Sequence, residues 1–292
     1  MKEENLLFSI VILNYNTFQE TLSCINSFVK IKNQDNIVLK FVIVDNNSPD
    51  GSGSLLKTHY EYDESVNVLL CKENLGFSKG NNVGYKYSLK YNPDFIILSN
   101  SDIEVKQKDF FNIIISLFEK KNFSVLGPDV YNPVKKIHQS PIFLDRPLDT
   151  KFVQRRILKL YKRRLSLLCR SFFNIKPSFQ MNKRTFNTND SYKKESCNGY
   201  LQGSFLIFSR NFMEAFPEGL YDGTFMYGEE LILYYLLKEK EMLELYSPDI
   251  QVIHYEGVAT KKSQGDYYKS SLWTNREMIK ASYEILKVVK DK

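Results

Sequence analysis

The amino-acid sequence predicts an α/β protein with a mostly parallel sheet that is flanked by helices. Two observations support this class. Through the first 130 residues, apolar runs suited to buried strands alternate with segments of helical periodicity, as in sheets covered on both faces. Polar residues follow the apolar runs, at the edge where such sheets bind ligands. The length of 292 residues and the 43% hydrophobic content suit one large or two small domains and exclude a wholly disordered chain.

The first predicted strand, Leu6–Leu13, is a continuous apolar run, and the helix after it extends to about Ile31. Thr17 and Glu20 have the spacing of a capping box, in which two side chains bind free N–H groups at a helix start, so we expect them to begin this helix. The other strands expected in this half are Val38–Val44, Val66–Cys71, Asp94–Ser99 and one that begins at Ser124–Leu126, and the other helices are Ser78–Tyr91 and Lys108–Lys121.

The second half of the chain is less regular. A loop at 132–142 precedes a basic segment, and a polar stretch at 182–198 follows it. The regular elements expected beyond are a strand at Leu201–Phe208, a helix at Glu229–Lys240, a short strand ending at Val252–His254 and a helix from about Tyr267 to Val289.

The net charge of +6 is unevenly distributed along the chain. Between Thr150 and Asn189 there are eleven lysines and arginines and no acidic residue, so this segment carries +11 and the rest of the chain −5. Residues 151–173 have apolar side chains at three- and four-residue steps, which predicts a basic amphipathic helix. Its predicted apolar face consists of Val153, Ile157, Leu160, Tyr161, Leu165, Leu168 and Phe172.

Basic amphipathic helices are typical of proteins that bind a membrane surface, because cations attract anionic lipids while apolar side chains enter the interface. We therefore expect a peripheral membrane contact through residues 151–173. The alternatives are a helix packed on the domain with a solvated charged face, or a contact between copies in a homo-oligomer. Nucleic acid is not expected as a partner, since no nucleic-acid-binding module accompanies the charge.

The protein is expected in the cytoplasm, at the inner face of the cell membrane. No run approaches the roughly 18–20 apolar residues of a membrane span, and residues 1–5 lack the pattern of a signal peptide. The four cysteines form no C-x-x-C pair, which fits a reducing compartment. The glycine motifs of dinucleotide dehydrogenases and P-loop NTPases are absent, which excludes those classes.

Seven short motifs follow one another along the chain: Ser9–Asn16, Val44–Ser52, Asn74–Asn82, Leu98–Asp102, Gln202–Ser204, Phe225–Glu230 and His254–Gly257. Their order and spacing closely resemble family-2 glycosyltransferases of the GT-A fold. The sequence looks most like the bacterial branch of rhamnosyl- and galactosyltransferases that builds capsules, O-antigens (lipopolysaccharide) and other surface glycans. The resemblance covers about residues 6–130 and 197–265.

This resemblance implies a GT-A catalytic domain over residues 1–265, followed by a C-terminal helix at 266–292. Within the domain it implies a nucleotide-sugar-binding half at 1–130, a basic helical insertion at 131–198 and an acceptor and base half at 199–265. The implied reaction is inverting transfer of a sugar from a nucleotide-sugar donor, a UDP- or dTDP-sugar, to a glycan or lipid-linked acceptor.

The residues that the resemblance assigns to the donor are Asn14, Tyr15, Asp45, Asn46, Gly76, Lys79, Asn81, Asn100 and Asp102. Gly76 would let the backbone approach the ligand closely. Two of these positions also suit structural roles. Asp45 can form an Asx turn before Pro49, and Asn81 can pack at a helix start.

A departing diphosphate needs a cation to stabilise its growing negative charge, and Mn²⁺ or Mg²⁺ prefers oxygen ligands. Asp102, at the end of an apolar strand, is the expected ligand, with a role as helix or turn cap as the alternative. By the resemblance, His254 contacts the metal or the diphosphate. Asn100 stands where the family usually has a first carboxylate, and Lys261 and Lys262 are candidates to clamp the diphosphate.

Inverting transfer needs one general base, which takes the proton of the attacking acceptor hydroxyl. The matching position is Glu230, with Glu229 as the second candidate; alternatively both only favour the helix dipole. Ile232 and Leu236 stand where the family often has Asp and Arg, so the acceptor does not carry over. Two rival functions are a nucleotidyltransferase, which would need a basic glycine-rich loop after the first strand, and a non-catalytic binding or scaffold protein of this fold.

Overall fold

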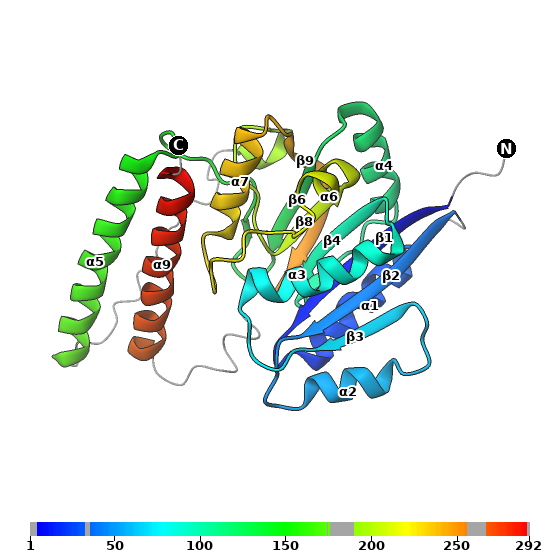
Figure 1. Ribbon diagram of the computed structural model, residues 1–292, viewed down its shortest axis with the longest axis horizontal. Helices are drawn as coiled ribbons and strands as arrows, with labels where there is room; N and C mark the ends of the chain where they lie inside the picture. The colour runs from blue at the N-terminus through cyan, green and yellow to red at the C-terminus, as the bar shows by residue number, and fades with distance from the viewer. Residues whose placement is uncertain (1–4, 33–35, 174, 176–189, 256–266, 291–292) are drawn as a thin grey trace.

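The computed structural model describes residues 5–32, 36–173, 175, 190–255 and 267–290. They form a curved sheet with helices on both faces (Figure 1). Two long helices, α5 (Thr150–Phe172) and α9 (Tyr267–Lys290), lie side by side next to this body (Figure 1). The predicted α/β class, with flanking helices, a basic helical insertion and a helix near the C-terminus, is confirmed.

The sheet joins nine strands within the described residues, in the order β3-β2-β1-β4-β8-β6-β9-β5, with β7 paired to β6. The strands are β1 Leu6–Asn14, β2 Ile37–Asp45, β3 Val66–Leu70, β4 Phe95–Asn100, β5 Ile103–Glu104, β6 Val125–Asn132, β7 Ile137–His138, β8 Phe205–Ser209 and β9 Glu244–His254. β3, β2, β1 and β4 are parallel, as their helical connections require, and β6 is parallel to β9. β8 is antiparallel to β4 and β6.

Two layers of helices cover the sheet, one on each face. The remaining α-helices are α1 Phe18–Ile31, α2 Ser52–His59, α3 Phe77–Ser88, α4 Phe110–Lys121, α6 Arg210–Ala215 and α7 Glu229–Glu239. α1, α2 and α4 share a hydrophobic core with one face, around Phe8, Phe28 and Phe110. α3, α6 and α7 cover the other face, around Val11 and Tyr85. Successive strand residues point to opposite faces, so the continuous apolar runs follow from burial on both sides.

The predicted helix start at Thr17 is confirmed, but the Thr17 half of the predicted capping box is absent. α1 begins after Thr17, but the Thr17 side chain makes no capping hydrogen bond. Its hydroxyl donates to Asn14 Oδ1 (3.0 Å) and accepts from Ser101 Oγ (2.8 Å). Tertiary partners at the sheet edge therefore replace the local helix contact.

Helix α5 forms over the predicted basic segment, but its predicted apolar face is only partly right. Val153 and Ile157 are buried in a cluster with α7 and α9, and Leu160 is also buried. The predicted face also includes four side chains that are exposed: Tyr161, Leu165, Leu168 and Phe172. Leu167 is buried instead. No helix in the described ranges is long and apolar enough to cross a membrane.

Candidate functional site

Three predicted site residues lie at the carboxyl ends of neighbouring parallel strands. Asn14 ends β1, Asp45 ends β2 and Asn100 ends β4. In the parallel ladders Asn14 pairs with Asp45, and Leu13 pairs with Asn100. The three residues therefore share one edge of the sheet, the edge at which α/β sheets bind ligands.

The buried carboxylate of Asp45 is the centre of the first cluster at this edge. Asn14 Nδ2 donates to Asp45 Oδ1 (2.6 Å), and the Ser48 N–H donates to Asp45 Oδ2 (3.0 Å). This local bond reaches three residues on, one further than in the Asx turn considered for Asp45. Asn14 Nδ2 also donates to Ser52 Oγ (3.0 Å). A Cβ atom on Gly53 would overlap the Asp45 carboxylate, so this glycine makes room for it beside the start of α2.

Asn46 and Gly76 join the β2 end to the loop before α3. The Leu75 N–H donates to Asn46 Oδ1 (2.8 Å), and Asn46 Nδ2 donates to the Gly76 carbonyl (3.0 Å). Gly76 has φ of 80°, and a Cβ there would overlap the Phe225 carbonyl. The close approach that Gly76 permits in this structure is therefore to the chain around Phe225, next to the start of α7.

Three other predicted donor residues are near this edge but outside the cluster. Asn81 is buried, and its side chain donates to the Phe77 carbonyl of its own helix (3.0 Å), which is the structural role considered for it. Lys79 is exposed on the first turn of α3, and Tyr15 is half-buried just after β1. Of these three residues, Lys79 and Tyr15 therefore keep side chains that face solvent at least in part.

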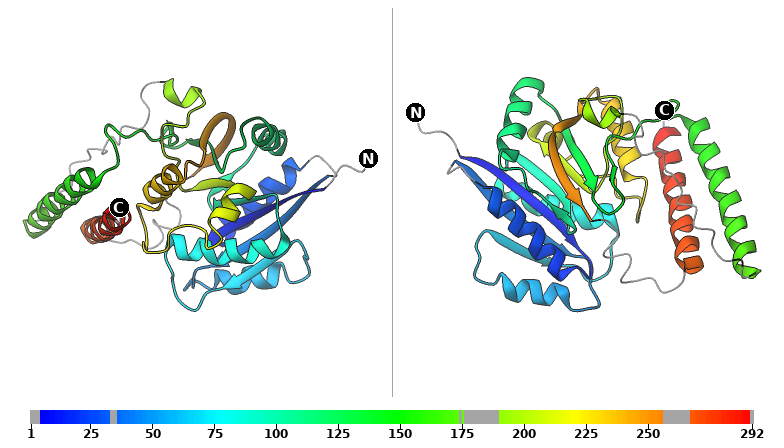
Figure 2. Two further views of the ribbon diagram at one scale, coloured as in Figure 1. Left: turned by 45° about the horizontal axis from the view of Figure 1, so that its top comes forward. Right: turned by 180° about the vertical axis from the view of Figure 1, so that it is seen from behind.

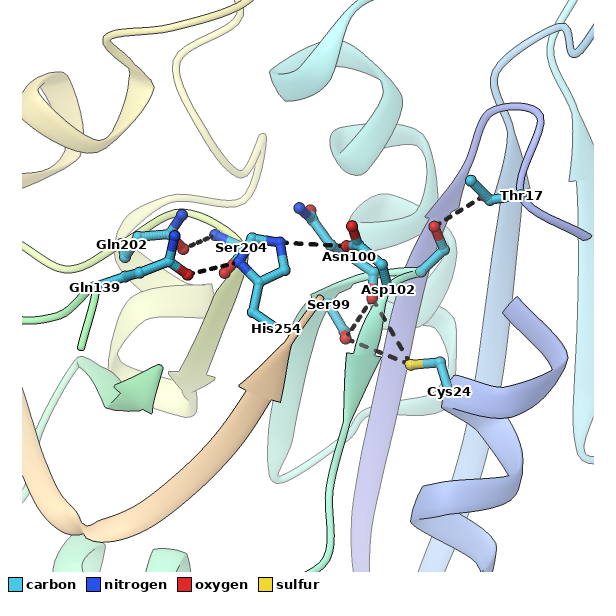
Figure 3. Close-up of polar contacts among 10 residues, drawn as sticks. Thr17, Cys24, Ser99, Asn100, Asp102, Gln139, Gln202, Ser204 and His254 are labelled. Atoms are coloured by element: carbon cyan, nitrogen blue, oxygen red, sulfur yellow. Dashed lines mark hydrogen bonds and ion pairs between the residues drawn. The ribbon is translucent and has the colours of Figure 1, made fainter. Parts of the chain in front are cut away.

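A second cluster forms around Asp102 (Figure 3), and hydrogen bonds through Thr17 connect it with the first. Ser101 Oγ donates to Thr17 Oγ1 (2.8 Å), and Thr17 Oγ1 donates to Asn14 Oδ1 (3.0 Å). His254 ends β9, which pairs with β5 directly after Asp102. His254 Nε2 lies 3.3 Å from Asp102 Oδ1, and its Nδ1 lies 2.8 Å from Gln139 Oε1 (Figure 3).

The pair of Asp102 and His254 fits a divalent cation that takes its other ligands from a diphosphate and water. Both side chains are at least nine-tenths buried, and a carboxylate oxygen and an imidazole nitrogen face each other. In the tautomer with the proton on Nδ1, His254 donates to Gln139 Oε1 and its Nε2 lone pair faces Asp102. A cation between the two side chains would favour this tautomer. Within the described ranges no group of three or more His, Cys, Asp and Glu side chains could hold a metal. Lys261 and Lys262 lie outside the described residues.

Asn100 links the Asp102 cluster to the segment before β8. Its N–H donates to the Ser204 carbonyl (2.9 Å), and Ser204 N–H donates to Gln202 Oε1 (2.6 Å). A Cβ on Gly203 would lie 2.9 Å from Glu230 Oε1, so the carboxylate of Glu230 rests against this glycine. Glu230, the candidate base, thus contacts the residue that precedes Ser204, whose carbonyl is bonded to the β4 end.

Glu229 and Glu230, at the start of α7, have different surroundings. Glu229 is buried, and its Oε2 has no hydrogen-bond partner. Burial, and then the negative charge of Glu230, raise the pKa of Glu229 to about 8. Glu229 is therefore mostly protonated at neutral pH and points into the protein, whereas Glu230 is half-buried at the surface of the site.

Several site residues carry no clear signal in the sequence. Gln139 becomes a partner of His254 only when β7 folds back on β6, because its N–H donates to the Val130 carbonyl (2.8 Å). Ser48 and Ser52 lie in the predicted turn, where their type suggests local hydrogen bonds without showing that Asn14 would bridge to them.

The fold is the one found in solved GT-A glycosyltransferases. Three solved structures share it. S. aureus TarS 1–349 is 13% identical with a TM-score of 0.51, and the match covers 86% of this chain and 58% of that chain. GalNAc-T7 with UDP, GalNAc and Mn²⁺ is 13% identical with a TM-score of 0.55, and the match covers 85% of this chain and 43% of that chain. The mannosyltransferase PcManGT from Pyrobaculum calidifontis with GDP-Man and Mn²⁺ is 10% identical with a TM-score of 0.52, and the match covers 99% of this chain and 74% of that chain. At these identities the likeness shows the fold alone.

The particular family follows from the sequence match. The family model described as "Glycosyl transferase family 2" matches residues 9–204. The chain therefore belongs to this family, as its motifs predict. A curated relative, the "Low-salt glycan biosynthesis hexosyltransferase Agl10" of Haloferax volcanii, is 29% identical over 125 residues. That match spans 42% of this chain and 36% of the relative.

Proposed function

We propose that this protein is a metal-dependent, inverting glycosyltransferase that moves a sugar from a UDP- or dTDP-sugar to a glycan or lipid-linked acceptor. The single observation that carries the proposal is the placement of two groups near the β4 end. The carboxylate–imidazole pair includes Asp102, two residues after Asn100, whose N–H donates to the Ser204 carbonyl, and the surface carboxylate of Glu230 rests against Gly203, the neighbour of Ser204. The Asp102–His254 pair can hold the diphosphate through a cation, and Glu230 can receive a proton.

Each residue has a defined part in this reaction. Asp45, held by Asn14, binds the nucleoside, and Asp102 with His254 holds the cation. The bound Mn²⁺ or Mg²⁺ supplies positive charge to the departing diphosphate. Glu230 takes the proton of the acceptor hydroxyl as that oxygen attacks the anomeric carbon. Glu229, mostly protonated at neutral pH, is a poor base and spares Glu230 a neighbouring negative charge.

The similar proteins support the finer parts of the proposal. GalNAc-T7 and PcManGT hold Mn²⁺ together with UDP or GDP-Man, and the Agl10 relative is named a hexosyltransferase of glycan biosynthesis. We extend the proposal to synthesis of a capsule- or O-antigen-type polysaccharide at the cytoplasmic face of the membrane. We also propose one catalytic domain over 1–265, with its donor half at 1–130 and its acceptor half at 199–265. No specific observation favours a nucleotidyltransferase or a scaffold.

The decisive experiment compares Glu230→Gln with Glu229→Gln. Removing the base should lower transfer by roughly 10²–10⁴-fold while donor affinity stays the same, because Glu230 acts on the acceptor. Glu229→Gln keeps the shape of a neutral acid and should change transfer by at most a few-fold. Radiolabelled sugar transfer and donor titration measure the two effects. Full activity of Glu230→Gln would refute the assignment, and equal loss in both variants would point to a structural effect.

A further inference from the structure

Helices α5 and α9 carry much of the exposed apolar surface of the described chain. Ten of its eighteen exposed large hydrophobic side chains lie between residues 158 and 175 or on α9. Five of them recur on α5 at alternating three- and four-residue steps, which places them on one side of the helix. These five, named here the exposed stripe, are Leu158 (56% exposed), Tyr161 (48%), Leu165 (64%), Leu168 (45%) and Phe172 (82%).

The exposed stripe borders α9 on one of its flanks. The Tyr161 hydroxyl lies 3.3 Å from the Tyr283 hydroxyl, so the side of α9 that bears Tyr283 continues the same surface. The two helices run next to each other in every view (Figure 1 and Figure 2). Helical spacing puts every cation of α9 on the side of Tyr283, together with Trp273, and all of these side chains are exposed. They are Lys269, Trp273, Arg276, Lys280, Lys287 and Lys290.

Cations also border the stripe on its other flank. By the same spacing Lys151, Arg155 and Lys162 follow the stripe around α5, and all three are exposed. Arg163 and Arg170 point to the opposite side of α5. α5 contains eight lysines and arginines and no carboxylate, and α9 contains five against two glutamates. Both of those glutamates are paired within the helix, Glu277 with Lys280 and Glu284 with Lys287.

We infer that this composite face, the exposed stripe with its two basic borders, docks on an anionic lipid bilayer. Apolar side chains along one line enter the interface between headgroups and acyl chains, and cations on both borders meet the headgroups. The alternation of apolar centre and basic borders is complementary to such a surface. A second copy of this chain is a poorer occupant, because its own face would bring cations against cations.

The inference deepens the proposed function, on which its consequence for the acceptor rests. α9 packs with its other side on α7, the helix that starts with the candidate base. The Tyr221 hydroxyl donates to Glu284 Oε2 (2.9 Å), and a Cβ on Gly228 would contact Ala281 and Ile285. A bilayer bound to the composite face is thereby coupled to the base helix through one element, which suits an acceptor carried on a lipid.

The test is sedimentation of the full chain with vesicles of phosphatidylcholine alone or with phosphatidylglycerol. We expect binding only to the anionic vesicles. Arg276→Gln with Lys280→Gln should weaken it about 25-fold, since each cation near such a surface contributes roughly five-fold. Leu158→Gln with Leu165→Gln should weaken it about ten-fold. Arg163→Gln with Arg170→Gln, on the opposite side of α5, is the matched control and should change binding less than either pair.

Two further measurements distinguish docking on a bilayer from a contact between copies of the chain. Trp273 is the only tryptophan, so its fluorescence should shift to the blue when anionic vesicles are added. Circular dichroism confirms that the exposed-site variants fold. Three results would overturn the inference. The wild type could fail to bind anionic vesicles, or the Arg276/Lys280 and Arg163/Arg170 variants could lose binding equally. The third is a dimer in sedimentation equilibrium that Leu158→Gln with Leu165→Gln dissociates. Vesicle binding needs no transfer, so the Glu230→Gln result tests the proposed reaction separately.

Discussion

Asn14 is the side chain that joins the two clusters of the candidate site. Its amide nitrogen donates to Asp45, and its oxygen accepts from the hydroxyls of Thr17 (3.0 Å) and Thr21 (2.9 Å). All four side chains are buried, so each polar group needs a partner inside the protein. The orientation of Asp45 therefore depends on β1 and α1 as well as on its own turn.

Two glycines allow a test of the separate parts of the site. Gly53→Ala would press on the Asp45 carboxylate and should weaken donor binding. Gly203→Ala would place a Cβ 2.9 Å from Glu230 Oε1 and should lower the transfer rate with donor affinity unchanged. Calorimetric donor titration and initial transfer rates measure the two quantities. Gly51→Asn, at a φ of 79° with no neighbour within 4 Å, is the control for a tolerated glycine change. If the Gly53 and Gly203 variants changed donor affinity and transfer rate in the same way, the site would not have separate donor and base parts.

For single residues, the sequence predicts which side chains lie at the site better than it predicts their hydrogen-bond partners. Asn14, Asp45 and Asn100 end apolar runs, and their position at a common edge follows from the parallel strands. The capping role of Thr17 is a local rule that a tertiary partner, Ser101, overrides. Gln139 acts on His254 from 115 residues away, a distance over which periodicity carries no information.

At the scale of elements, α7 explains two departures from the family pattern. Ile232 and Leu236, which stand where the family often has Asp and Arg, pack in the cluster that α7 forms with α5 and α9. Ile232 is fully buried. A charge at position 232 would be buried without water, whereas position 236 is half-buried, so an apolar side chain at both positions suits the helix pair that covers α7. The departures therefore carry no argument against catalysis.

The first residue of β9 gives a prediction about pH. Glu244 is buried, one carboxylate oxygen accepts from the Leu201 N–H (3.2 Å), and the other has no partner. Burial raises its pKa from 4.5 to about 8. The folded state therefore keeps the proton between about pH 4.5 and 8 while the unfolded state releases it, so the stability falls as pH rises through this window. Glu244→Gln should remove part of that fall.

Thermal unfolding of the wild type and of Glu244→Gln from pH 5 to 9 measures this effect. The melting temperature of the variant should exceed that of the wild type at pH 8 and above, and the difference should shrink toward pH 5. Glu239→Gln, at the end of the neighbouring helix α7, serves as a comparison outside the buried position. A constant difference across the pH range would show that Glu244 is ionised in the folded protein.

Most strands and helices follow from the sequence, and the exceptions have physical causes. α2 is short and contains Ser52, Gly53 and Ser54, which favour turns over helix, so local propensity hides it. The three- and four-residue steps on α5 combine two neighbouring faces, one packed on α9 and one exposed, which periodicity alone does not separate. The antiparallel direction of β8 follows from its pairing with β4, which no local pattern encodes.

At the scale of the whole molecule, the positive charge and the candidate site belong to different parts of the protein. The helix pair carries thirteen lysines and arginines against two glutamates, so it exceeds the net charge of +6 and the remaining chain is net acidic. The sheet edge of the candidate site holds the carboxylates of Asp45 and Asp102, and in the proposed reaction a cation offsets their charge when the diphosphate binds. Lipid attraction and donor binding thus draw on separate charges.

This separation predicts independent effects of two sets of substitutions. Donor with Mn²⁺ should raise the melting temperature of the wild type, because it binds only the folded state, and Asp102→Asn should abolish the part that depends on Mn²⁺. Arg276→Gln with Lys280→Gln should leave that shift unchanged and reduce vesicle binding. The combined variant should show both losses at their single-variant sizes, since distant sites add. A panel of UDP- and dTDP-sugars in the thermal assay identifies the donor to use. Loss of vesicle binding in Asp102→Asn, or a reduced donor shift in the α9 variant, would show that the two surfaces are coupled and would contradict the separation.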